Sequence, residues 1–196
     1  MTLISKRNLA VLEAVPTTNT TGYDFTCVKI EDGKIWAGDG HHLYFSALSG
    51  NPDDYPDMGV SGIEHKECML IPAAALRKAE RDIPKSKNLP ILNNIQVLID
   101  DEYKHLVTTD LDITNDVKVK HQKDPTWPNT DQIVALFPKE PKVEVVLSVA
   151  ELETLVKVVK KHGAESVTFK INAPSDMVGV SSDDGDLQGY IMPYYK

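Results

Sequence analysis

The sequence has few of the features that mark secreted, membrane-bound or metal-stabilised proteins. Cys27 and Cys68 are its only cysteines, too few for a disulfide framework or for a structural zinc site, which needs four ligands. No apolar run approaches the roughly 20 residues that a membrane span requires. The N-terminal stretch has no apolar signal-peptide core and no cleavage site. We therefore expect a cytoplasmic protein with reduced, packed cysteines and no membrane partner.

Familiar catalytic patterns are missing as well. The chain has no HExxH zinc helix, no glycine-rich phosphate loop and no pattern that pairs a nucleophile with a base. A metal-dependent enzyme built on Asp39, His41 and His42 stays open as an alternative, since a carboxylate with two imidazoles can ligate a metal or transfer protons. Adjacent histidines in a strand point to opposite faces, which makes joint ligation awkward. We expect a protein that is not an enzyme and that has no cofactor and no metal.

What the chain does have is enough apolar material for a core and an uneven distribution of charge. With 196 residues, 41% of them hydrophobic, it can form one or two compact domains. A net charge of -8 argues against a nucleic-acid partner until its distribution is considered. Apolar spacing and end signals predict amphipathic helices at residues 5–15, 73–88 and 149–162. Bases outnumber acids only within these three segments.

The helix bases are the candidate DNA contacts. Ordinary solvated helix faces are the simpler interpretation of the same charges. The candidates are Lys6, Arg7, Arg77, Lys78, Arg81, Lys85, Lys87, Lys157, Lys160 and Lys161.

The third helix has the clearest end signals. Ser148 and Glu151 have the spacing of a capping box, and Gly163 can adopt the left-handed conformation that ends a helix. Pro84 is expected to end or kink the second helix. One face of the third helix carries an apolar stripe made of Leu152, Leu155, Val156 and Val159.

The predicted strands have a shorter spacing of apolar residues than the helices, and the order of helix and strands repeats along the chain. Short alternating or apolar runs predict strands at residues 25–30, 34–37, 43–47, 95–99, 105–109, 116–120, 143–147, 166–171, 178–181 and 189–192. A helix followed by hairpin strands occurs three times, at intervals of about 35 residues. We therefore predict an α+β fold of three half-domains, residues 1–66, 67–140 and 141–196.

Four landmarks along the chain resemble the bacterial DNA polymerase III β sliding clamp. Residues 89–94 with 109–113 are similar to its LPIL and TDLEI phrases, and residues 37–43 to its ATDGHRL motif, with Gly38 and His42 in place of Thr and Arg. Residues 124–139 are similar to its FPDY and LPK segment, and residues 190–196 to its C-terminal VMPMRL. The resemblance implies the DNA-clamp fold, in which two helix-on-antiparallel-sheet units of the β-α-β-β-β type make a domain.

In that family the landmarks meet to form a hydrophobic pocket for linear peptides of polymerases and of the clamp loader. Matching motif to motif implies a peptide pocket lined by His41, Leu43, Pro128, Ile133, Tyr190 and Met192. The implied function is a DNA replication processivity factor that encircles duplex DNA and tethers a polymerase. Family rings contain twelve repeat units, so three units per chain imply a homo-oligomer of four chains.

Two further alternatives stay open beside the enzyme. The first keeps the clamp fold without the ring: a monomeric or dimeric regulator that binds clamp-interaction peptides. The second is a structural protein with no nucleic-acid role. Retention on circular DNA, peptide binding and bound metal are the observations that separate these alternatives.

Overall fold

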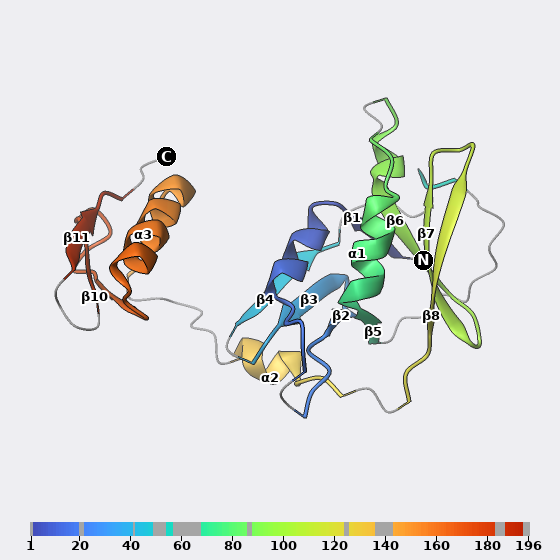
Figure 1. Cartoon of the computed structure of the whole chain (residues 1–196). Helices are drawn as coiled ribbons and strands as arrows, with labels where there is room; N and C mark the ends of the chain where they lie inside the picture. The colour runs from blue at the N-terminus through green and yellow to red at the C-terminus, as the bar shows by residue number, and fades with distance from the viewer. Residues whose placement is uncertain are drawn as a thin grey trace. The chain divides into compact units, whose positions relative to one another are not determined.

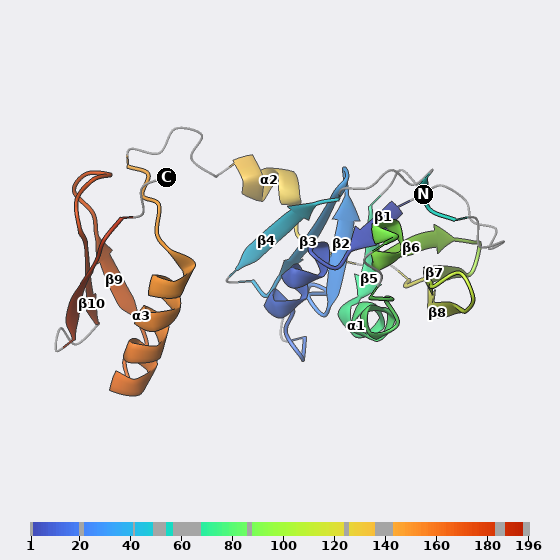
Figure 2. The same ribbon diagram turned by 90° about the horizontal axis from the view of Figure 1, so that it is seen from above.

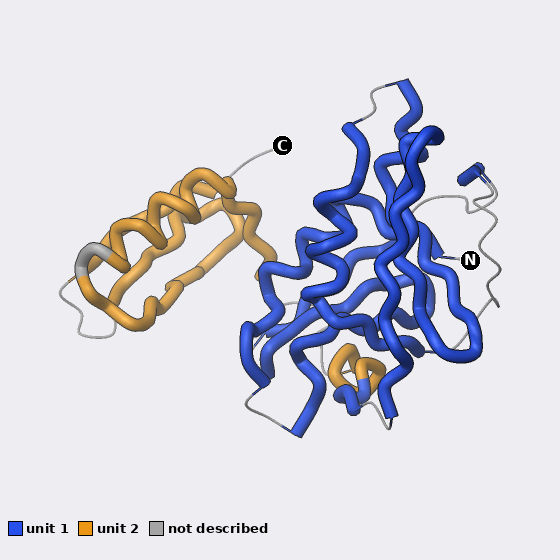
Figure 3. The backbone as a smooth tube through the Cα atoms, turned by 45° about the vertical axis from the view of Figure 1, so that its right-hand side comes forward, with its two compact units in different colours: residues 1–129 blue, residues 130–196 orange. Residues whose placement is uncertain are grey.

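The chain forms two compact units, residues 1–129 (unit 1) and residues 130–196 (unit 2), which are described separately (Figure 3). The computed structural model describes residues 2–19, 22–40, 42–48, 54–56, 68–85, 88–123, 126–135, 143–182 and 187–193. Its class is mixed α and β, with three antiparallel sheets and few helices. The predicted half-domain 141–196 lies in unit 2, and the predicted half-domain 1–66 lies in unit 1.

Unit 1 contains the same order of elements twice: one strand, one helix and then three strands. The first repeat consists of β1 (Thr2–Ser5), the 3₁₀ helix η1 (Asn8–Ala14), β2 (Cys27–Glu31), β3 (Lys34–Gly38) and β4 (Leu43–Ala47). The second consists of β5 (Met69–Pro72), α1 (Ala73–Arg81), β6 (Asn94–Ile99), β7 (Tyr103–Thr109) and β8 (Thr114–Lys120), with the 3₁₀ turn η3 (Pro90–Asn93) before β6.

The two repeats exchange their first strands. The sheet orders are β1-β6-β7-β8 and β4-β3-β2-β5, so β1 joins the sheet of the second repeat and β5 joins the sheet of the first (Figure 1). Ile4 lies opposite Ile95, and Ile71 lies opposite Val28, at equivalent places in the two junctions. Each repeat therefore completes the sheet of the other.

Both helices of unit 1 lie side by side on the same side of the sheets (Figure 2). The core between helices and sheets contains Leu12 of η1, Leu76 of α1 and the inward strand residues Ile35, Ile95 and Leu106, all at most 2% exposed. Burying one such side chain stabilises the fold by about 1.5–3 kcal/mol. The runs that predicted strands at residues 34–37, 95–99 and 105–109 contain the inward strand residues of this core.

Two predicted helices are shorter than expected. The segment 5–15 begins at Ser5, the last residue of β1, and its helix is a 3₁₀ helix that begins at Asn8. The buried Asn8 side chain accepts from the Ser5 amide at 3.0 Å and donates to the Ala47 carbonyl at 2.8 Å. The second helix ends at Arg81 instead of residue 88. Pro84 restricts residue 83 to non-helical conformations, so the helix stops before it.

Two turns position the strands of unit 1. Asp32 and Gly33, with φ of 49° and 69°, join β2 to β3 in the positive-φ geometry that a two-residue hairpin needs. The apolar, clamp-like phrase at residues 89–94 is not a strand: it forms the turn η3, and only its last residue, Asn94, belongs to β6. Pro90 favours this result, because proline fixes φ near the helical value and suits the first helical position.

The described part of unit 2 contains one repeat. Its elements are α2 (Thr130–Ala135), α3 (Val149–His162), β9 (Val167–Lys170), β10 (Val178–Ser182) and β11 (Gln188–Ile191), with the sheet order β11-β10-β9. Gly163 ends α3 in the left-handed conformation at φ 88°, as predicted. The prediction of a capping box is wrong, because Ser148 occupies the N-cap position but makes no side-chain capping hydrogen bond. Of the predicted stripe, Val159 is buried whereas Val156 is 49% exposed.

The predicted strand at residues 143–147 is also wrong: this segment belongs to none of the sheets among the described residues. Val145 and Leu147 nevertheless pack against the small core of unit 2, which consists of Val178, Val180 and Ile191. A strand needs a neighbour to supply its backbone hydrogen bonds, and the described part of unit 2 has no strand beside this segment.

Candidate DNA and peptide interfaces

A groove between η1 and α1 gathers three of the predicted DNA contacts. Its volume is about 320 Å³. Lys6 precedes η1 and Arg77 and Arg81 belong to α1, so residues far apart in the sequence meet here. The lining consists of Lys6, Leu9, Ala10, Leu12, Glu13, Arg77, Glu80 and Arg81. Glu13 and Glu80 reduce the positive charge of the groove.

Arg77 has a structural task that the sequence did not indicate. Its Nη2 donates to the backbone carbonyl of Leu12 at 2.7 Å. The same carbonyl accepts from the Val15 amide at 3.1 Å, and a cation at the C-terminal end of a helix also interacts favourably with the helix dipole. Arg77 thus ties the helix of one repeat to the helix of the other.

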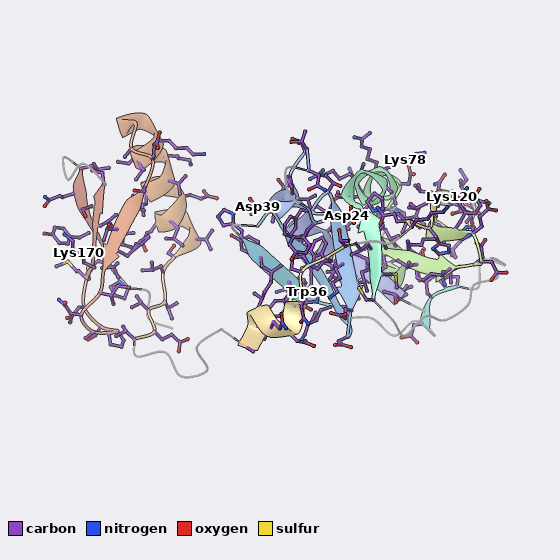
Figure 4. All side chains as sticks on the ribbon, turned by 90° about the horizontal axis from the view of Figure 1, so that it is seen from below. Asp24, Trp36, Asp39, Lys78, Lys120 and Lys170 are labelled. Atoms are coloured by element: carbon purple, nitrogen blue, oxygen red, sulfur yellow. The ribbon has the colours of Figure 1, made fainter. Side chains whose placement is uncertain are left out.

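The other bases of unit 1 are placed differently from one another. Lys78 is exposed and extends from α1 away from the strands (Figure 4). Lys85 follows the end of α1 and is exposed. Arg7 is exposed and lines a different groove, between η1 and β4. The prediction for Lys87 lies outside the described residues.

In unit 2, Lys157 and Lys160 are exposed on α3. The Lys157 ammonium lies 4.0 Å from the Glu153 carboxylate, one helical turn earlier. Exposed pairs of this spacing contribute only about 0.3–0.5 kcal/mol. The side chain of Lys161 is outside the described part of the chain.

Unit 2 carries an apolar groove between α3 and β11, with a volume of about 370 Å³. Leu155 and Val158 of α3 form one wall. Tyr190 and Met192 form part of the other and are 74% and 57% exposed. Large apolar side chains held open to solvent around a groove suit the binding of a peptide with apolar anchors. The resemblance predicts Tyr190 and Met192 in a peptide pocket. It does not predict Leu155, which the sequence places in the apolar stripe of the helix, or Val158.

Three other residues of the predicted pocket are described elsewhere in the chain. Leu43 begins β4 and is half-buried, and Pro128 is half-buried near the end of unit 1. Ile133 is on α2 and is 36% exposed. His41 lies outside the described residues. Of the predicted set, Tyr190 and Met192 line the groove described within unit 2.

A second groove in unit 1, of about 810 Å³, runs between η1 and β4. Tyr44 and Phe45 line it and are 54% and 55% exposed. The Phe45 ring lies 4.7 Å from the Trp36 ring, centroid to centroid. The sequence did not predict this groove. The residue pattern of a strand shows that its two faces differ in polarity, but it does not show which part of a face a neighbouring helix leaves uncovered.

The turn before β4 holds the carboxylate and imidazole of the enzyme alternative. Asp39 accepts from the His42 amide at 2.8 Å and lies 3.3 Å from its ring Nδ1. A side chain at residue 38 would collide with the His42 carbonyl, so the turn requires Gly38. Over the described ranges, no three His, Cys, Asp or Glu side chains are placed to hold a metal ion.

His105 of β7 forms a second polar cluster in unit 1. Its ring nitrogens lie 2.8 Å from Asp116 and 2.8 Å from Asp100. Burial lowers the pKa of His105, but the hydrogen bonds to Asp100 and Asp116 outweigh it, and the net pKa is raised. The same contact with His105, together with the amides of Tyr103 and Glu102, holds the pKa of Asp100 well below its usual value. This cluster joins β7, β8 and the β6–β7 turn.

Comparison of the sequence with models of known protein families and with curated protein sequences gives no match. Among the described helices, none is both long enough and apolar enough to cross a membrane.

Proposed function

We propose that the chain is a sliding-clamp-like processivity factor of DNA replication. In this proposal several copies encircle duplex DNA, and an apolar groove holds a peptide of the polymerase. Its action is topological and electrostatic, and no bond is made or broken.

The observation that carries the proposal is the exchange of first strands between the two repeats of unit 1. The resemblance of the four sequence landmarks to sliding clamps implies domains made of two helix-on-sheet repeats. Two repeats of the order strand, helix and three strands, with their helices side by side, agree with that implication. The topology and the landmarks are independent, because the landmarks lie mainly in turns and segment ends.

The helix side of unit 1 suits contact with phosphates. Lys6, Lys78 and Arg81 are exposed there, while Arg77 is engaged with the Leu12 carbonyl. Contacts between such bases and phosphates carry little sequence information and release counterions, so binding weakens steeply with salt. Such contacts allow a ring to slide, and the acidic remainder of the chain disfavours binding through other faces.

The groove between α3 and β11 supplies a site for the peptide. Its open Tyr190 and Met192, backed by Leu155 and Val158, offer apolar subsites for a few anchor side chains. A few anchors in such subsites can provide most of the affinity.

A topological trap tests the proposal. Linear DNA of several kilobases is incubated with the protein, its ends are then joined by ligase, and the circle is washed in high salt. Protein that encircles DNA stays on the closed circle and leaves when a restriction enzyme linearises it. Equal loss from circular and linear DNA in high salt would exclude encirclement. A matched variant, Lys78→Ala with Arg81→Ala, should lower binding in low salt without changing the circular dichroism spectrum.

A regulator that does not form a ring is the second candidate. It is favoured by the apolar groove of unit 2, which belongs to a single repeat and needs no closed ring to bind a peptide. Binding of a bacterial clamp-binding peptide in fluorescence anisotropy, together with no retention on circular DNA, would select this candidate.

A further inference from the structure

The third repeat differs from the first two in the apolar segment that precedes its helix. In unit 1 this segment is β1 before η1 and β5 before α1. In unit 2 the segment of residues 143–147 ends directly before α3 but lies outside the sheet. The third repeat therefore has the sequence of a first strand without the pairing of one.

The sheet of unit 2 has an edge to which no first strand is paired among the described residues. The strand after the helix in each repeat of unit 1, β2 or β6, pairs on one side with its own hairpin partner and on the other with the first strand of the other repeat. Its counterpart β9 pairs only with β10 among the described residues. An open edge of this kind is a template for another strand.

The side chains around this edge are exposed in a way that those of unit 1 are not. Ile4 of β1 and Ile71 of β5 are fully buried, whereas Val143 is 36% exposed. On the sheet side, Phe169 and Ile171 are 42% and 41% exposed. The core of unit 2 is correspondingly small: it consists of Val178, Val180 and Ile191, against which the half-buried Val145 and Leu147 pack within one copy.

We propose that two copies of the chain exchange residues 143–147, each adding this segment to the β9 edge of the other copy. A second copy is the occupant that the topology selects, because residues 143–147 and the β9 edge are both unpaired among the described residues and are complementary to each other. A second copy offers both the missing strand and the missing edge, and mutual exchange gives the two-fold symmetry of a closed dimer. The inference rests on the topology of unit 1 and does not depend on DNA binding.

The register follows from unit 1. There, the core-facing pairs nearest the helices are Ile71 with Val28 and Ile4 with Ile95, each one residue before the end of the first strand. Leu147 lies two residues before the start of α3, as Ile71 lies two residues before the start of α1, and Val167 is the core-packed residue that begins β9. The expected core-facing pairs between copies are therefore Leu147 with Val167, Val145 with Phe169 and Val143 with Ile171.

The alternate positions of this register also match. Val146 lies opposite Thr168, and Glu144 lies opposite Lys170, both on the outer face. Lys170 is exposed on β9, where Figure 4 labels it, and Glu144 is exposed as well. Opposite charges directly across two strands are stabilising, and the symmetric dimer contains this pair twice. A shift of one residue would place Glu144 on the core face.

Light scattering of the full-length chain over a concentration series tests the association. We expect a dimer, or a multiple of it, that the Val143→Asp variant weakens by at least about tenfold, because a carboxylate would be buried opposite Ile171. Val149→Asp is the matched control, since Val149 is 73% exposed at the start of α3. A wild-type chain that is monomeric throughout, or equal effects of the two variants, would overturn the proposal.

Cysteine pairs test the register. In a Cys68→Ser background, the Val146→Cys, Thr168→Cys double variant should oxidise to a covalent dimer, and the offset Glu144→Cys, Thr168→Cys double variant should not. A disulfide that forms within one chain would overturn the exchange, and equal cross-linking of both pairs would overturn the register. Neither readout requires DNA, so failure here leaves the DNA trap as a separate result.

Discussion

Unit 1 and unit 2 are built from the same kind of repeat, yet unit 1 contains two repeats and the described part of unit 2 contains one. In unit 1 each repeat receives a strand from the other, and the inward residues of both sheets are almost fully buried. In unit 2 one repeat stands alone, with a three-stranded sheet and a core of Val178, Val180 and Ile191. The comparison shows that strand exchange completes both sheets of unit 1, whereas residues 143–147 and the β9 edge lack this pairing among the described residues of unit 2.

Truncation at the same helix position in both units should sharpen this contrast most. Leu76 is the fourth residue of α1 and fully buried, and Leu152 is the fourth residue of α3 and half-buried. Leu76→Ala should lower the free energy of unfolding by about 2–5 kcal/mol. Leu152→Ala should lower the free energy of unfolding clearly less, because truncating a partly exposed side chain removes less buried apolar surface. Urea unfolding with one probe in each unit measures both. Equal losses would show that unit 2 is packed as completely as unit 1.

The tie between helices should give the next largest effect. Arg77→Ala removes the donor to the Leu12 carbonyl and should destabilise unit 1 by about 1–3 kcal/mol. Glu153 has the equivalent place on α3 and pairs only loosely with Lys157. Glu153→Ala should change stability by no more than about 0.5 kcal/mol. Urea midpoints compare the two, and a larger loss for Glu153→Ala would contradict the account of Arg77.

The stability of unit 1 should depend on pH through His105. Its pKa is raised in the folded chain above the ordinary 6.5, so its contribution is fully present below that value and is lost as pH rises through the folded pKa. The pKa of Asp100 is lowered, so the contribution of Asp100 is present above its ordinary 3.8 and is lost only as pH falls further. Wild type should therefore exceed His105→Gln most clearly between these two values.

Amide exchange, followed by NMR at several pH values, reads the two units separately. The difference between wild type and His105→Gln should shrink as pH rises and should appear in β7 and β8, not in β10. A constant difference across that range would mean that the contacts of His105 with Asp100 and Asp116 carry no net charge interaction.

The smallest expected effect concerns the bases. Lys78→Ala on α1 and Lys157→Ala on α3 should each reduce the slope of log K against log salt for duplex DNA by about 1. If only unit 1 faces the DNA, Lys157→Ala will leave the slope unchanged, which a filter-binding titration at several salt concentrations resolves.

Much of the fold could be predicted where a local pattern determines it. The neighbouring strands predicted at residues 25–30 and 34–37 and the glycine end of α3 depend on local sequence, and the structure confirms them. The strands β1 and β5 were missed, because their partners lie far along the chain and short apolar segments before a helix look like helix beginnings.

The candidate sites were predictable only in part, for a similar reason. Clustered helix bases indicated Lys6, Arg77 and Arg81, but the carbonyl that holds Arg77 comes from another repeat. Val158 of the apolar groove lies outside the predicted stripe of α3. The segment 143–147 has the composition of a strand, and composition cannot specify whether its partner belongs to the same chain.

The measurement that tests the account most directly compares wild type with Val143→Asp in the DNA trap. Both proteins should bind linear DNA equally in low salt, because the substitution leaves every helix base in place. After ligation and a high-salt wash, we expect wild type to stay on the circle until it is linearised, and Val143→Asp to be lost. Loss of wild type from the closed circle would contradict encirclement, and retention of Val143→Asp would contradict closure through unit 2.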